Sequence, residues 1–327
     1  MSTPSSEFDL IARLRRRVAT RDDVVLGIGD DAAILRLPPG RDLVVAMDTL
    51  NAGVHFPEAT SPADIGWKAL AVNLSDLAAM GATPAWCTLS LSLPEADPVW
   101  VEAFLDGFLE LANAHGVALV GGDTTRGPLS VCVTAHGFVE AGSALLRSGA
   151  RAGDDIWVSG TLGDAAGALV KGGQSGFSRT KTHSDPLLFL LFRLDRPTPR
   201  VALGRALRGI ATSCIDVSDG LLADLGHVCA ASGVGAEVEL ASLPLSPALR
   251  SAFDEDMRRA LQATGGDDYE LCFTAPESAR TDVEQAARNA GVAVARIGRV
   301  VAGGGVAAFD ADGNPWTPSR TGYAHFA

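Results

Sequence analysis

The feature that most constrains the fold is an alternation of short apolar β-like runs with longer helical runs through both halves of the chain. Strands are predicted at residues 43–47, 117–120, 131–135, 156–159, 236–240, 271–274 and 306–309. Helices are predicted at residues 64–80, 98–115, 163–170, 219–231 and 277–290. Because both element types occur in each half, the sequence predicts α/β or α+β layers, with mixed sheets flanked by helices.

The length of 327 residues suits one large domain or two ordinary ones. Glycines 142, 149 and 153 cluster near residues 140–154, where we expect the boundary. The predicted domains are therefore residues 1–145 and 146–327. Residues 171–186 are polar and rich in glycine and serine, which predicts a surface loop.

Composition and charge exclude several classes of protein. A formal net charge of −12 is a poor match for nucleic acid, and the arginines between 13 and 21 are typical of a solvated helix face. The five cysteines are widely spaced and odd in number, which favours reduced thiols over a disulfide framework. No signal peptide and no apolar run of about 20 residues is present, so we expect a cytoplasmic protein that does not bind a membrane.

The stretch GIGDDAA at residues 27–33 places two carboxylates directly after a glycine turn. Carboxylates beside a phosphate repel it unless a cation lies between them, so this motif favours a metal site over a direct phosphate cradle. Asp31 is the metal candidate, whereas Asp30 is as well explained as the cap of a following helix. Asp48 closes the predicted strand 43–47, at the strand end where active sites of α/β folds often lie.

Asp76 is the most diagnostic carboxylate, because it continues the apolar stripe of Ile65, Ala69 and Val72 on the predicted helix 64–80. A lone buried carboxylate costs several kcal/mol unless it is paired or bound to a metal. Lys68 lies on the same side of the helix and could pair with it. A metal-binding role and an ion pair both remain open for Asp76 at this point.

Three more carboxylate motifs lie in predicted loops: GGDTTRG at residues 121–127, IDVSDG at 215–220 and GGDDYE at 265–270. Ser218 could cap the helix that follows the second motif. Magnesium binds through few carboxylates plus waters and substrate phosphates, so the pattern suits several magnesium ions bridging the protein to ATP. No calcium loop, zinc motif, P-loop, protein-kinase motif or G-x-S-x-G elbow is present. The sequence therefore predicts a phosphoryl-transfer enzyme.

These motifs, together with NLSDLAAMG at residues 73–81, resemble those of thiamine-monophosphate kinases in the aminoimidazole-ribonucleotide-synthetase-like ATP-binding superfamily. The resemblance runs in order from about Phe8 to Phe326. It implies ATP-dependent conversion of thiamine monophosphate to thiamine diphosphate, the final step of thiamine diphosphate biosynthesis. It also implies a homodimer formed through the N-terminal sheets, an N-terminal domain that binds ATP and magnesium, and a C-terminal domain that completes the active site.

The resemblance also implies residue roles. Magnesium contacts are implied for Asp31, Ala46, Met47, Asp48, Asp76, Asp123, Asp216 and Asp219. ATP contacts are implied for Gly122, Asp123, Arg147 and Ser218, and thiamine monophosphate contacts for His55, Asp267, Arg320 and Tyr323. Four positions depart from the family pattern. Ala46 and Met47 replace hydroxyl side chains and could offer only backbone carbonyls, Asp267 stands where glutamate is frequent, and Arg320 stands where an aromatic residue is frequent.

An acceptor phosphate is already ionised at neutral pH, so the reaction needs no general base or nucleophile, and we expect direct in-line transfer. Sibling enzymes are the first alternative. The chain lacks the N-terminal reactive cysteine of selenophosphate synthetases and the C-terminal cysteine of hydrogenase-maturation relatives, and it fits purine-pathway synthetases less well. A catalytically silent magnesium–nucleotide binding protein is the second alternative.

Overall fold

The computed structural model describes residues 15–172 and 186–323, which form two compact units. The first unit contains the described residues up to Leu77 together with Ala82–Gly142. The second contains Ala78–Gly81 and the described residues from Ser143 onward.

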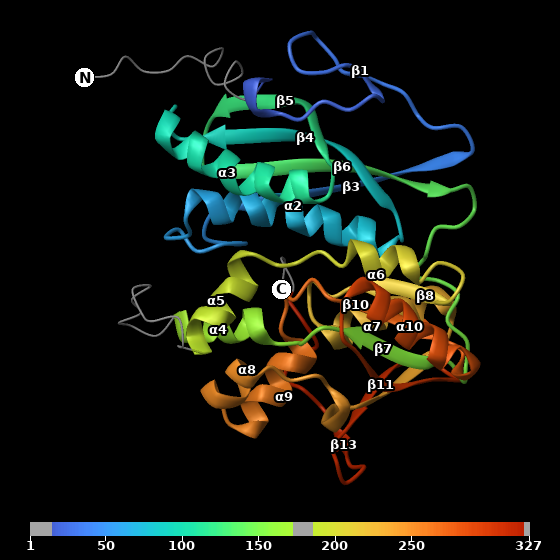
Figure 1. Ribbon diagram of the computed structural model, residues 1–327. Helices are drawn as coiled ribbons and strands as arrows, with labels where there is room; N and C mark the ends of the chain where they lie inside the picture. Colours follow the sequence, from blue (N-terminus) through green and yellow to red (C-terminus); the bar gives the residue numbers. More distant parts are fainter. Residues whose placement is uncertain (1–14, 173–185, 324–327) are drawn as a thin grey trace. The chain divides into compact units, whose positions relative to one another are not determined.

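The first unit is built on a four-stranded sheet in the order β3-β6-β4-β5, with α2 and α3 along one face (Figure 1). Its strands are β3 (Arg41–Asn51), β4 (Thr83–Leu93), β5 (Ala118–Arg126) and β6 (Ser130–Glu140). Its helices are α2 (Pro62–Ala79) and α3 (Pro98–Ala114). β4 and β5 are parallel, and the other pairs are antiparallel. β3 and β5 are therefore the two edges of this sheet.

The backbones of α2 and α3 come into direct contact, because each helix carries a glycine at the point where the two cross. A Cβ on Gly66 would lie 2.1 Å from the carbonyl oxygen of Phe104, and one on Gly107 would lie 1.8 Å from that of Ala63. Asp97 begins α3 by accepting the amide of Val99 at 2.9 Å, with a proline at the first helical position. The close crossing holds α2 against the sheet and so fixes the distance between the polar residues of α2 and the strands.

A short two-stranded sheet, β1 (Val24–Leu26) with β2 (Ile34–Leu35), covers part of the first unit. Val24, Ala33 and Leu35 pack on a buried cluster that includes Trp86 and Phe138. The rings of Trp86 and Phe138 meet edge to face at 4.9 Å, and the Trp86 indole donates to Asp23 at 3.0 Å. This packing anchors the glycine-rich turn between the two strands.

The second unit is built on a seven-stranded mixed sheet in the order β13-β12-β9-β11-β7-β10-β8. Its strands are β7 (Asp155–Ser159), β8 (Ser213–Asp216), β9 (Gly235–Glu239), β10 (Leu271–Ala275), β11 (Val294–Val301), β12 (Gly305–Phe309) and β13 (Pro315–Trp316). Its helices are α4 (Asp164–Gly172), α5 (Pro186–Asp195), α6 (Val201–Ala206), α7 (Leu221–Ser232), α8 (Pro247–Ala252), α9 (Glu255–Thr264) and α10 (Arg280–Ala290). Only β9 and β12 pair in parallel among these strands.

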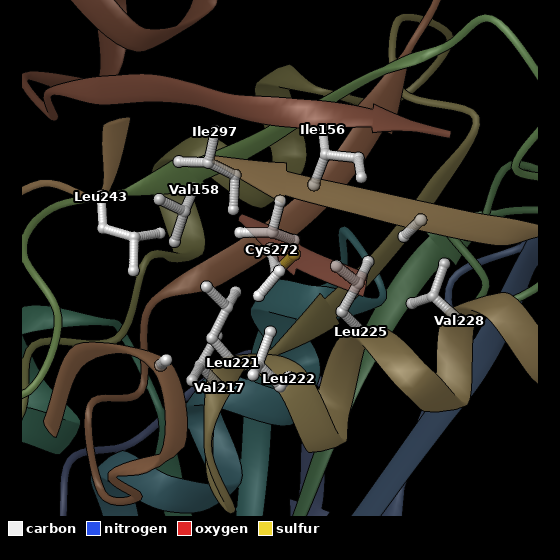
Figure 2. Close-up of a cluster of buried hydrophobic side chains, with 14 of the residues drawn as sticks. Ile156, Val158, Val217, Leu221, Leu222, Leu225, Val228, Leu243, Cys272 and Ile297 are labelled. Atoms are coloured by element: carbon white, nitrogen blue, oxygen red, sulfur yellow. The ribbon is translucent and has the colours of Figure 1, made fainter. Parts of the chain in front are cut away.

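The core of the second unit lies between this sheet and α7 (Figure 2). Leu221 and Leu225 of α7 are almost fully buried with Val158, Cys272 and Ile297 of the strands. Burying each aliphatic side chain contributes about 1.5–3 kcal/mol. Val217 and Leu221 are both fully buried, so the core fixes each end of the short loop between β8 and α7.

The expected fold class is confirmed, and every predicted strand and helix is present with shifted ends. The sequence did not predict the short strands β1, β2, β8 and β13, the longer β4 and β11, or the helices α5, α6, α8 and α9. Of the predicted loop 171–186, Lys171 and Gly172 belong to α4, Pro186 begins α5, and the rest lies outside the described residues. Across the described ranges, no helix combines the length and the apolar character needed to cross a membrane.

Candidate active site

A cavity of about 730 Å³ in the first unit brings together two of the carboxylate motifs. It is lined by the turn 27–33 and by residues 119–124 of β5, so Asp31, Gly122 and Asp123 share one cavity. The volume is in the range of small-molecule sites. Asp31 and Asp123 are exposed at its wall, where they can meet a cation and a ligand from solvent.

The interpretation of Asp30 as a helix cap is wrong. The strand β2 follows this turn, not a helix, and the Asp30 carboxylate accepts the amide of its neighbour Asp31 at 2.9 Å. Arg15 also lines the cavity, and its guanidinium lies so close to Gly29 that a Cβ there would approach Nη1 within 2.6 Å. The charge of Arg15 had suggested only a solvated helix face, so this cavity residue was missed.

Gly122 is a glycine for a steric reason. Its φ is 153°, and a Cβ would lie 1.9 Å from the carbonyl oxygen of Leu89 on the parallel neighbour β4. The register shift of β4 between Cys87 and Thr88 precedes this contact. The chain at Gly122 can therefore bring backbone amides up to a ligand without a side chain in the way.

Asp48 on β3 and Asp76 on α2 form a pair of carboxyl groups within hydrogen-bonding distance. Burial raises the pKa of Asp48, while the hydrogen bond from Asp76 and the nearby His55 oppose that rise. The Asp48 amide donates to the Asn73 side-chain oxygen of α2 at 3.1 Å. The structure confirms that Asp76 lies beside the buried apolar stripe of α2.

His55 lies in the turn after β3, and its position is fixed by two contacts. Its Nδ1 accepts the amide of Asn51 at 3.0 Å, which leaves Nε2 as the protonated nitrogen of the neutral ring. Its carbonyl oxygen accepts from the fully buried Lys68 ammonium at 3.0 Å. Ala46 and Met47 precede Asp48 on β3, where Met47 is 64% exposed.

The candidate residues of the first unit form two groups, not one. Asp48 aligns with Val133, Leu89 and Gly122 along one row across the sheet. Three strand spacings separate Asp48 from Gly122, which is about 14 Å. Asp48 and Asp123 therefore cannot bind the same ion within one copy of this unit.

In the second unit, the buried Asp216 ends β8, and Ser218 and Asp219 lie on the loop between β8 and α7. The interpretation of Ser218 as a helix cap is wrong, because Gly220 holds the cap position. Asp224 takes that duty instead: its Oδ2 accepts the amides of Ser218, Asp219 and Gly220 at 3.0–3.1 Å. Burial, and next the negative charge of Asp216, raise the pKa of Asp224 to about 7. Asp224 was not among the predicted site residues, because the predicted helix began at 219 and the first turn of α7 lies two residues further along.

The segment 265–270 lies directly against this loop. The Asp267 amide donates to the Ser218 carbonyl at 2.8 Å, and the Tyr269 amide donates to that of Val217 at 2.8 Å. Tyr323 also reaches the loop, because its amide donates to the Asp219 carbonyl at 2.9 Å. The second unit therefore gathers Asp216, Asp219 and Ser218 with two predicted substrate residues, Asp267 and Tyr323.

Arg147 and Arg320 are not placed with this group by any hydrogen bond or ion pair among the described residues. The Arg147 carbonyl accepts from Ser232 at the C-terminal end of α7. The neighbouring Leu146 carbonyl accepts the amide of Cys214 on β8 at 2.8 Å, two residues before Asp216. Both arginine side chains are exposed.

The donor set fits magnesium but not a closed metal cage. Across residues 15–172 and 186–323, no group of three or more His, Cys, Asp or Glu residues is arranged to hold a metal ion. The Asp48–Asp76 pair supplies two half-buried carboxyls that lie within hydrogen-bonding distance of each other. Magnesium binds through one or two carboxylates with water and phosphate completing its shell, so such a pair is sufficient.

Comparison with known proteins gives the family. Residues 29–139 match the AIR synthase related protein N-terminal domain, and residues 151–311 match the C-terminal domain. The curated thiamine-monophosphate kinase of Escherichia coli (strain K12) is 48% identical over 98% of both chains. The chain belongs to the thiamine-monophosphate kinase family.

Solved structures agree with this membership. The thiamine-monophosphate kinase of Stenotrophomonas maltophilia K279a matches with a TM-score of 0.89 and 56% identity, covering 96% of this chain and 99% of that one. A structure described as AaThiL complexed with AMPPCP and TMP matches with a TM-score of 0.76 and 33% identity, covering 98% and 97%. A thiamine-monophosphate kinase fold thus extends over both units.

Proposed function

We propose that this chain transfers the γ-phosphoryl group of ATP to thiamine monophosphate, giving thiamine diphosphate and ADP. The observation that carries the proposal is the whole-chain similarity to thiamine-monophosphate kinases, at 48% identity over 98% of the chain. The related structure with an ATP analogue and TMP supports both substrates. The step is the last one that makes thiamine diphosphate.

The cavity of the first unit supports a nucleotide-binding role for Gly122 and Asp123, with Arg147 and Ser218 as further ATP contacts. Amides beside Gly122 would donate to phosphate oxygens, since no side chain intervenes. His55, Asp267, Arg320 and Tyr323 would contact thiamine monophosphate. The fixed Nδ1 of His55 supports this role, because it leaves an N–H donor on Nε2.

Asp31, Asp48, Asp76, Asp123, Asp216 and Asp219 would hold magnesium ions, and the backbone carbonyls of Ala46 and Met47 would add contacts. When bound, magnesium supplies positive charge that offsets the repulsion between the donor and acceptor phosphates. The residues of the chain bind and orient the two phosphates for direct in-line transfer, with no covalent enzyme intermediate. The acceptor oxygen is already ionised, so no residue needs to remove a proton from it.

A homodimer formed through the N-terminal sheet is part of the proposal. On the edge strand β3, Leu43, Val45 and Met47 are exposed at alternate positions, which gives an apolar stripe on one face. We also propose that residues 1–145 bind ATP and magnesium and residues 146–327 complete the site. A cytoplasmic location is supported by the five cysteines, which are all free thiols.

Incubation with ATP, magnesium and thiamine monophosphate tests the proposal by chromatography of the products. We expect thiamine diphosphate and ADP in equal amounts, and no product when magnesium is removed by a chelator. ATP binding without any product would instead favour the silent magnesium–nucleotide binding protein. A phosphorylated form of the protein, trapped during turnover with labelled ATP, would contradict direct transfer.

A further inference from the structure

Asp267 and Tyr269 are the two non-glycine residues with positive φ in the described part of the chain, at 68° and 50°. A left-handed conformation is strained for an L residue, because its Cβ comes close to the following carbonyl oxygen. Such a conformation persists only where contacts with the surrounding structure hold it in place, and it is frequent at functional sites. The two residues flank Asp268, so the contacts of this segment must hold it in place.

The inward side of the segment is anchored through Asp268. Its side chain is buried, and Oδ2 accepts the amide of Gly163 at 2.8 Å. Its carbonyl oxygen accepts from Arg193 at 3.3 Å. Burial raises the pKa of Asp268 well above its ordinary value.

Glu270 provides the second anchor, and it is fully buried and fully paired. Arg200 grips it with two bonds, Nε to Oε2 at 2.6 Å and Nη2 to Oε1 at 2.5 Å. Arg193 adds a bond to Oε1 at 2.7 Å, and the Ser159 hydroxyl donates to Oε2 at 2.6 Å. A buried carboxylate is tolerated only with such partners, and losing one partner leaves an uncompensated charge.

The outward side of the same segment carries the Asp267 carboxylate. The Tyr269 hydroxyl donates to Oδ1 of Asp267 at 3.1 Å. The two left-handed residues therefore bond to each other on one side of the segment, while Asp268 and Glu270 hold the other side. A shift of the Glu270 anchor would rotate the backbone that sets Asp267.

We propose that Arg200 and Tyr269 are positioning residues for thiamine monophosphate: Arg200 anchors the strained segment through Glu270, and Tyr269 orients the Asp267 carboxylate. The inference rests on the proposed function, in which Asp267 contacts this substrate. Neither Arg200 nor Tyr269 needs to touch the substrate itself.

Two variants test the inference, Tyr269→Phe and Arg200→Lys. Tyr269→Phe removes one hydroxyl, and Arg200→Lys keeps the charge but loses the two-pronged grip. We expect each to raise KM for thiamine monophosphate about tenfold, while kcat stays within about twofold and KM for ATP is unchanged. A purely structural role would lower the melting temperature and the amount of active enzyme without this selective change in KM.

Arg280→Lys is the matched control. Arg280 grips Asp155 of β7 with the same two-pronged geometry, Nε at 2.6 Å and Nη2 at 2.9 Å, and it has no link to the 265–270 segment. We expect its KM values to match the wild type. If Arg200→Lys does not fold, the KM of Tyr269→Phe for thiamine monophosphate tests the inference by itself.

The inference would be overturned if Tyr269→Phe left KM for thiamine monophosphate unchanged. It would also be overturned if this KM rose equally in Arg280→Lys and Arg200→Lys. In both cases, turnover by the wild type would still uphold the proposed function. A wild-type protein that binds ATP but makes no thiamine diphosphate would overturn the proposed function, and the inference with it.

Discussion

At the scale of single residues, the Asp48–Asp76 pair brings two carboxyl groups together on neighbouring elements. The two carboxyls are half-buried and hydrogen-bonded to each other, and burial raises the pKa of Asp48. A hydrogen bond between two carboxyls needs a proton on one of them, so in the metal-free protein the pair shares a proton. Magnesium at the proposed site would take the place of that proton.

Asp76→Asn should lower turnover by about a hundredfold or more, because one of the two carboxylates proposed to bind magnesium is lost. The metal-free variant should melt no lower than the metal-free wild type, since the asparagine amide can still donate a hydrogen bond to Asp48. Steady-state kinetics at saturating magnesium measures the first effect, and thermal melts in chelator and in magnesium measure the second. The rise in melting temperature on adding magnesium should shrink.

Asp64→Asn is the control, because Asp64 lies in the first turn of the same helix and bonds to Ser61. It should keep both turnover and the magnesium-dependent rise in melting temperature. Near-normal activity of Asp76→Asn with saturating magnesium would remove Asp76 from the metal site.

Some features of the candidate site were predictable from the sequence, and others were not. The position of Asp76 beside the apolar stripe was predictable because the stripe is visible in one segment of sequence. Glu270 stood in a recognised motif, yet its partners Arg193 and Arg200 lie 77 and 70 residues away. Pairings at such separation are decided by tertiary structure, which periodicity and turn signals do not encode.

At the scale of elements, the approach of β5 to β4 explains a difference between two adjacent glycines. A Cβ on Gly122 would collide with the Leu89 carbonyl, whereas the nearest atom to a Cβ on Gly121 is 3.8 Å away and belongs to the Thr88 methyl. Gly122 also has a positive φ, unlike Gly121. Both lie at the wall of the cavity.

Gly122→Ala should destabilise the protein by about 1–3 kcal/mol, because β5 must move away from β4. It should also weaken nucleotide binding, since the cavity wall moves with the strand. Urea unfolding and calorimetric titration with a non-hydrolysable ATP analogue measure the two effects. Gly121→Ala is the paired variant and should unfold like the wild type; equal destabilisation by both would show that close strand packing is not the cause.

Two elements show why sequence patterns fell short. The Gly/Asp stretch after residue 120 predicts a loop, but β5 continues to Arg126 because its parallel pairing with β4 overrides local propensity. In β4, Leu89, Leu91 and Leu93 alternate with serines, which is a strand signal that could have been used. α8 and α9 are short, and their N-terminal caps, Ser246 and Asp254, are the clearest signals of these two helices in the sequence.

At the scale of the whole molecule, the alternation of strands and helices was enough to predict mixed sheets flanked by helices. It did not reveal the strand order, because β7 pairs with β10 and β11, which lie more than a hundred residues further along the chain. Long-range pairing of this kind depends on which apolar faces meet.

The exposed apolar stripe on β3 supports the proposed dimer. Val45 is 54% exposed and Leu43 is 41% exposed on the same face of an edge strand, which is a liability for a protein that stays monomeric. We expect a dimer in solution, and Val45→Glu should dissociate it because an unpaired charge would be buried at the interface. Sedimentation equilibrium at micromolar concentration measures the mass directly. Val99→Glu is the control, since Val99 is 78% exposed on α3, away from the stripe, and should leave the dimer intact. A monomeric wild type would show that the stripe is not a dimer interface, and an undisturbed dimer in Val45→Glu would place the interface on another surface.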